Sequence, residues 1–177
     1  TDPNIYYALT LASATDPNFK GEDLRKYADK LSPTDFKHFV DLQGKANKPG
    51  ESEQMATVTQ QKDAIVKALE LKGADVGVFH QVADRALLAE QTRLGRMPTQ
   101  EERQRVLDRL VLEGTTPGTL WNSSTRAFKA QAEGKPFTPV WNDAQKRNAT
   151  AALQRQGVKN PTPQQVDAVL RATYGTQ

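Results

Sequence analysis

Apolar residues recur at spacings of three and four along most of this chain, which is the period of amphipathic α-helices. The letters Thr-Asp-Pro-Asn occur at residues 1–4 and again at 15–18. Asp followed by Pro is typical of a helix start, because the Asp side chain accepts hydrogen bonds from the free amides of the first turn. Ser32 before Pro33, and Thr99 with Glu102 three residues later, give the same signal. The pattern predicts helices over residues 4–14, 22–30, 33–44, 52–72, 75–94, 99–114, 143–156 and 162–174.

The pattern changes between residues 115 and 142. Pro and Gly at 117–118 end the preceding helix, and residues 119–129 alternate imperfectly around a polar turn at 122–125, which favours a β-hairpin. Residues 133–141 contain a Gly and two Pro residues and are expected to be extended. The predicted fold class is therefore mainly α, a bundle of short helices with one irregular segment or small β-hairpin near 115–142.

Three parts follow from this pattern. Residues 1–114 are expected to form a helical domain, residues 115–142 an extended arm or hairpin, and residues 143–177 a C-terminal helix pair. A chain of 177 residues is long enough for one ordinary domain or two small ones.

Composition removes several classes of protein. The chain has no cysteine, which excludes disulfides, zinc–thiolate sites and thiol catalysis. Its apolar runs are only a few residues long, so no transmembrane segment is expected. The 24 Lys and Arg residues exceed the 21 Asp and Glu residues by three, and residues 115–177 carry eight bases against three acids. The positive charge therefore belongs to the C-terminal third.

Candidate catalytic groups are few. Only His38 and His80 are present, and neither has neighbours at metal-ligand spacing, so we expect both to be structural or exposed and predict no metal site. No nucleophile elbow, phosphate-binding loop or dinucleotide fingerprint occurs, so no catalytic residue and no cofactor is predicted. Glu51-Ser52 is similar to the Glu-Ser pair of lytic transglycosylases, but the Gly-rich and Leu-Met-Gln segment that follows it in that family is missing. Helix-start chemistry explains Glu51 and the pair at 101–102.

Aromatic residues gather in and beside the irregular segment, at Trp121, Phe128, Phe137 and Trp141. Interleaved with bases, such residues can stack on nucleic acid. The favoured interpretation is that they hold the segment against its own helices or against another copy of the chain. Both make these four residues the candidate interaction sites.

The adjacent bases Lys146 and Arg147 are the candidate anion contact. The other bases of the C-terminal third are scattered singly among Gln, Asn and Ala residues, which is typical of a solvated surface.

Two stretches resemble a known family. The first comprises Ile-Tyr-Tyr-Ala-Leu at 5–9, Asp-Pro-Asn-Phe at 16–19, Glu-Asp-Leu-Arg-Lys-Tyr at 22–27, Leu-Ser at 31–32, Asp-Phe at 35–36 and Val-Asp-Leu-Gln at 40–43. The second comprises residues 89–99, Glu-Glu at 101–102 and Val-Leu-Asp-Arg-Leu at 106–110. Both resemble segments of large internal or ejected virion proteins of tailed phages, in the region that accompanies a lytic transglycosylase module. Together they cover about half of the chain.

This resemblance implies a non-enzymatic structural or assembly module of a phage virion protein, internal or used in DNA ejection. It would act through helix packing and oligomerisation, with copies of itself or other virion proteins as partners and DNA as a further contact. It would be located in the virion and, after ejection, in the host envelope or periplasm. The alternatives are a peptidoglycan-degrading accessory domain and a DNA-binding module that uses the basic C-terminal third.

Overall fold

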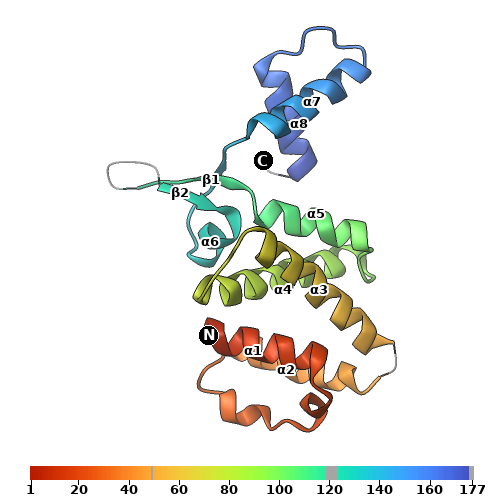
Figure 1. Ribbon diagram of the computed structural model, residues 1–177, viewed down its shortest axis with the longest axis vertical. Helices are drawn as coiled ribbons and strands as arrows, with labels where there is room; N and C mark the ends of the chain where they lie inside the picture. The colour runs from red at the N-terminus through yellow and green to blue at the C-terminus, as the bar shows by residue number, and fades with distance from the viewer. Residues whose placement is uncertain (49, 119–122, 176–177) are drawn as a thin grey trace. The chain divides into compact units, whose positions relative to one another are not determined.

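The computed structural model describes residues 1–48, 50–118 and 123–175, and the chain divides into two compact units, Thr1–Arg96 and Met97–Gln177 (Figure 1). We call them unit 1 and unit 2. The chain is 68% helical with a small antiparallel sheet, which confirms the predicted fold class. Within the described residues, no helix is long and apolar enough to span a membrane.

Unit 1 consists of four α-helices and two 3₁₀ turns. They are α1 (Pro3–Thr15), η1 (Pro17–Gly21), η2 (Leu24–Tyr27), α2 (Pro33–Ala46), α3 (Glu51–Ala68) and α4 (Ala74–Leu94). The helix expected over 22–30 is only the short 3₁₀ turn η2, in which the Asp23 side chain accepts the Arg25 amide and the Ala28 amide bonds back to the Arg25 carbonyl. Helices held by hydrogen bonds between residues i and i+3 seldom run beyond three or four residues, so this element stays short.

The predicted helix starts in unit 1 are confirmed by their capping bonds. The Asp2 carboxylate accepts the amides of Asn4 and Ile5, and the Asp16 carboxylate accepts the amide of Asn18. The Ser32 hydroxyl accepts the Asp35 amide. These side chains satisfy amides that have no partner inside their helix.

Apolar packing in unit 1 begins among its first elements. The buried cluster consists of Tyr6, Leu9, Phe19, Leu24, Leu31, Phe39 and Ala46. Helix α1 contacts α2, α3 and α4, and its closest approach is to α4, where Gly77 lies directly against the backbone of Pro3. A Cβ atom at position 77 would overlap the Pro3 carbonyl group, so only glycine fits this approach.

Helix α3 buries polar residues. Met55, Val58 and Ile65 form its apolar stripe and are only partly buried, whereas Thr59 and Lys62 are the buried residues among those described in the helix. The reason is that this side of α3 faces the Asp84 carboxylate of α4, and that carboxylate requires a cation as its partner.

Unit 2 combines helices with the sheet. Its elements are α5 (Gln100–Leu110), β1 (Glu113–Thr116), β2 (Ser123–Arg126), α6 (Ala127–Ala132), β3 (Thr138–Pro139), α7 (Asp143–Arg155) and α8 (Pro163–Tyr174). The strand order is β2-β1-β3, with Gly114 opposite Thr125 and Thr115 opposite Thr138. A hairpin is therefore present. Residues 123–125, which the sequence pattern places in its turn, instead belong to β2, because they pair with residues 114–116 of β1.

Three helices of unit 2 begin with a capping box. The paired residues are Thr99 with Glu102, Asn142 with Gln145, and Thr162 with Gln165. Leu112, Trp141, Ala149 and Leu170 form a buried apolar cluster beneath α7 and α8.

The boundary between the units lies after Arg96, ahead of the position at residue 114 that the sequence pattern suggests. Gly95 ends α4 in the left-handed conformation, with φ of 68°, and the Thr99 cap begins a new helix four residues later. Helix α5 contacts α6 and α8, so it belongs to unit 2.

We predict that Gly77→Ala destabilises unit 1 by about 1–3 kcal/mol, because the added methyl group overlaps the backbone of α1. Urea unfolding measures the change. Gly44→Ala is the matched control: it lies inside α2 with open space around it, so it should stabilise unit 1 by about 0.5–1 kcal/mol. Equal stability of Gly77→Ala and the natural chain would contradict the close approach of α1 and α4.

Candidate functional site

Side chains from all four helices of unit 1 meet at the Asp84 carboxylate. The Lys62 ammonium lies 2.5 Å from Asp84 Oδ1, and the Tyr6 hydroxyl donates a 2.8 Å hydrogen bond to Oδ2. His38 Nε2 lies 3.7 Å from the same Oδ2. The Lys62 side chain is only 2% exposed, so the ion pair is shielded from water. We call these four residues the Asp84 cluster.

The protonation states of the cluster follow from burial and pairing. Burial raises the pKa of Asp84, but the Lys62 charge and the hydrogen bonds from Lys62 and Tyr6 outweigh it and hold that pKa below its usual range. Burial, and then the Asp84 charge, raise the pKa of the Tyr6 phenol. The aspartate is therefore ionised beside a neutral phenol that remains a hydrogen-bond donor.

A second buried carboxylate, Asp35, ties the start of α2 to α4. It accepts hydrogen bonds from the Thr1 hydroxyl, from Ser32 Oγ at 2.6 Å and from Gln81 Nε2 at 2.8 Å. Arg85 Nη2 lies 3.1 Å from its Oδ1. Burial raises the pKa of Asp35. The hydrogen bonds from Ser32 and Thr1 and the Arg85 charge lower that pKa by more, so the net shift is downward.

His80 is fully buried on α4, and its Nε2 lies 3.1 Å from Asp63 Oδ1 on α3. Its ring contacts that of Tyr7 on α1, with centroids 5.0 Å apart. Burial, and next the charge of Lys62, lower the pKa of His80 to about 4, so its ring is neutral near pH 7. His80 is thus a core residue that bridges three helices.

These groups resemble the acids and bases of enzymes, but a general acid or base must come within hydrogen-bonding reach of its substrate. Lys62 and Asp84 instead bond to each other, and His80 bonds to Asp63, among packed helices. Within the residues that the structure describes, no group of three or more His, Asp or Glu side chains is arranged to hold a metal ion. What the arrangement does is hold α1, α2, α3 and α4 together.

The glutamates considered for glycan cleavage stand at helix starts. Glu51 is the first residue of α3 and lies 3.8 Å from Lys48. The Glu102 carboxylate accepts the Thr99 amide at 2.8 Å in the capping box of α5. Their positions agree with helix-start chemistry.

Trp141, one of the predicted interaction residues, is part of the interior of unit 2. Its indole Nε1 donates to Asp167 Oδ1 at 2.8 Å, and its ring stacks on Tyr174 with centroids 5.6 Å apart. These contacts join the segment before α7 to α8.

Two other predicted interaction residues also pack inward. Phe128 on α6 is fully buried, and Phe137 is partly buried against the apolar cluster of unit 2. The Phe137 ring fills the space beside Gly114, where a Cβ atom would overlap it. Trp121 lies outside the described residues. The three described aromatics therefore hold their own unit together and do not form an exposed surface.

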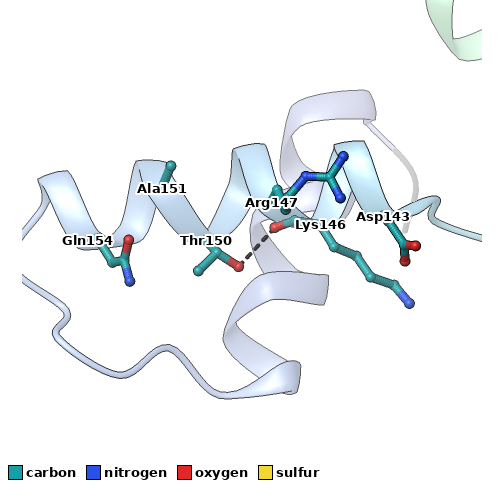
Figure 2. Close-up of a pocket in the computed structure, with 6 residues that line it drawn as sticks. All are labelled: Asp143, Lys146, Arg147, Thr150, Ala151 and Gln154. Carbon is teal, nitrogen blue, oxygen red and sulfur yellow. Dashed lines mark hydrogen bonds between the residues drawn. The ribbon is translucent and has the colours of Figure 1, made fainter.

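The candidate anion contact lies on the exposed face of α7 (Figure 2). Ala149 and Leu153 are buried on the other side of the helix. A shallow hollow runs along the exposed face, lined by Asp143, Lys146, Arg147, Thr150, Ala151 and Gln154. Lys146 and Arg147 are both exposed, and the described part of the chain places no ion-pair partner on either. The structure thus brings the two predicted bases together on one open surface.

The Asp84 cluster is the feature that sequence reasoning missed. The available signal was the position of Lys62, which is three residues before Ile65 and seven after Met55, inside the apolar stripe of α3. A charged residue at such a position indicates a buried partner, but nothing in the pattern identifies Asp84 as that partner.

Comparisons of the chain with protein-family models, with curated proteins and with solved structures found no match.

We predict that Lys62→Met destabilises unit 1 by about 3–5 kcal/mol, because it leaves the Asp84 charge buried without a counterion. The double change Lys62→Met with Asp84→Leu should be more stable than the single change, since it removes both charges. Urea unfolding of the three chains measures this difference.

Lys26→Met is the control, because Lys26 forms an exposed ion pair with Glu22 on the surface of the same unit. It should change stability little. A Lys62→Met chain as stable as this control would show that the ion pair is not buried in solution.

Proposed function

We propose that this chain is a structural module of a tailed-phage virion protein, which works by helix packing and by assembly with copies of itself or with other virion proteins. The first family-like stretch, residues 5–43, supports this proposal. Its quoted letters supply Tyr6, Leu9, Phe19, Leu24 and Leu31 of the buried cluster of unit 1. The shared letters thus lie where they determine packing, and on this proposal the protein resides in the virion and reaches the host envelope after ejection.

The observation that carries the proposal is the inward pairing of charged groups across the helices of unit 1. Lys62, Asp84 and Asp35 each bond to residues of other helices. Lys62 and Asp35 are almost completely buried, and the Asp84 side chain is 11% exposed. Charges used in this way lock helices in one arrangement, which is what an assembly module requires of its scaffold.

Assembly needs an exposed apolar surface, and unit 1 has large aliphatic side chains in water. Leu88 on α4 is 56% exposed, Val40 on α2 is 43% exposed, and Leu11 on α1 is 38% exposed. Because these side chains are already about half covered, burying the rest against a partner is favourable by roughly 0.7–1.5 kcal/mol each. We propose the contact between copies on this unit, since the three described aromatic residues among those predicted in unit 2 pack within that unit.

We predict that the mass measured by light scattering rises with concentration for the natural chain. The double change Val40→Lys with Leu88→Lys should give a folded monomer, because it places charge on the proposed contact surface. Val140→Lys is the matched control, since Val140 is 57% exposed in unit 2, and this variant should assemble like the natural chain.

Circular dichroism would establish that each of these chains is folded. A natural chain that stays monomeric across the series would overturn the assembly proposal.

A second candidate function, contact with DNA, is favoured by the exposed face of α7. Its two bases have no described ion-pair partner, and Thr150 and Gln154 add polar side chains along the same hollow. Lys and Arg side chains that reach phosphates release condensed counterions, so the resulting affinity depends steeply on salt.

We predict that Lys146→Ala with Arg147→Ala weakens binding to a DNA duplex and lowers the slope of log affinity against log salt by roughly 0.9 for each lost phosphate contact. Fluorescence anisotropy over a salt series measures both quantities. Lys20→Ala with Lys37→Ala removes the same charge from exposed positions of unit 1 and serves as the control. Equal losses in the two double variants would indicate attraction by net charge alone and would remove α7 as the site.

A further inference from the structure

The two histidines of the chain lie in the same polar interior. His80 and His38 are the only histidines among the 177 residues, and they occupy facing helices of unit 1, α4 and α2. Within the described residues, His80 Nδ1 and His38 Nε2 are buried ring nitrogens without a hydrogen-bond partner. A neutral imidazole tolerates this, because one of its nitrogens is an acceptor that carries no proton.

Protonation of His80 would change that interior in two ways. It would place an N–H group at buried Nδ1, where no described acceptor receives it, and it would add a positive charge beside Lys62. A buried donor without an acceptor is costly, and so is a buried charge. Asp63 and Asp84 attract the new charge, but burial and the charge of Lys62 outweigh them. Asp63 faces Nε2 and is already hydrogen-bonded to the neutral imidazole ring.

Residues from other helices surround both rings. His80 on α4 is faced by Tyr7 from α1 and by Lys62 and Asp63 from α3, with Asp84 on its own helix. His38 on α2 is faced by Tyr6 from α1, Lys62 from α3 and Asp84 from α4, with Asp35 and Lys45 on its own helix. Protonated His38 would also compete with Lys62 for Asp84.

We propose that this interior is an acid-sensitive latch, in which proton uptake by His80, assisted by His38, breaks the contacts that hold α1, α2 and α3 against α4 and opens unit 1. Unit 2 contains no histidine, so it has no equivalent of this latch. Mild acid would therefore destabilise unit 1 toward its open form and leave the stability of unit 2 largely unchanged.

The direction and the pH window follow from proton linkage. Burial, with Lys62 adding to it, lowers the pKa of His80 to about 4, below the value near 6.5 of an unfolded chain, and burial lowers the pKa of His38 in the same direction. Stability from a neutral buried histidine is complete above pH 6.5 and is lost as the pH falls toward 4. For His80 the unfolding equilibrium of unit 1 should shift by roughly 50- to 100-fold between pH 7 and 4.5. The buried carboxylates Asp35 and Asp84, whose pKa values are lowered, lose their contribution only below about pH 4.

The test is urea unfolding of the full chain between pH 7 and 4.5, with the two units followed separately. Both tryptophans, at positions 121 and 141, belong to unit 2, so tryptophan fluorescence reports on that unit. Assigned amide NMR signals of α1 to α4 report on unit 1. His80→Gln is the informative variant, because the glutamine amide can donate to Asp63 but does not titrate, and His38→Gln measures the smaller share of His38.

We expect unit 1 of the natural chain to lose stability steeply below pH 6.5, unit 2 to change little, and His80→Gln to remove most of the loss. A His80→Gln chain that loses stability as steeply as the natural chain would overturn the proposal. Titration of the two imidazole signals in the natural chain needs no variant and decides the case if His80→Gln fails to fold. A His80 ring that titrates near pH 6.5 while unit 1 stays folded would overturn the latch, and one that stays neutral until the unit opens would support it.

Discussion

The ion pair between Lys62 and Asp84 is the constraint on which the arrangement of unit 1 depends. One carboxylate on α4 receives an ammonium group from α3 and a phenol from α1, and the imidazole of His38 on α2 lies close to it. A buried ion pair adds little net stability over apolar packing, but a displaced member leaves a buried charge unpaired. The pair therefore selects one register of α3 against α4 more strongly than it stabilises the fold.

The two units use charge in opposite ways. Residues 1–96 carry 13 bases and 14 acids, whereas residues 97–177 carry 11 bases and 7 acids. In unit 1, Lys62 and Asp35 are buried and each is paired with an opposite charge. In unit 2 the partly buried polar contact of Trp141 with Asp167 serves packing, and Arg171 also bonds that carboxylate. The bases of α7 are left on the surface. Unit 1 thus holds part of its charge among packed helices, whereas the charge of α7 in unit 2 lies on the surface.

Local signals in the sequence predict the elements well, because capping is a contact between residues two or three apart. The caps at Asp2, Ser32 and Thr99 and the hairpin in the C-terminal half follow from such signals. The Asp84 cluster does not, since its members come from four helices and a polar residue on a helix is usually solvated. The inward packing of Phe128 and Trp141 was open for the same reason: composition shows an aromatic residue but not which surface covers it.

The contact between α1 and α4 joins residues far apart in the chain, since the Tyr6 hydroxyl and the Asp84 carboxylate are separated by 78 positions. A ribosome makes α1 first and α4 last among the helices of unit 1. Until residue 84 has left the exit tunnel, the phenol of Tyr6 has no carboxylate to bind, and the face of α1 that meets Gly77 remains uncovered. The first helix of this unit to be synthesised is thus among the last to be completely enclosed. During translation, the contacts of α1 with α2 and η1 cover part of its apolar surface.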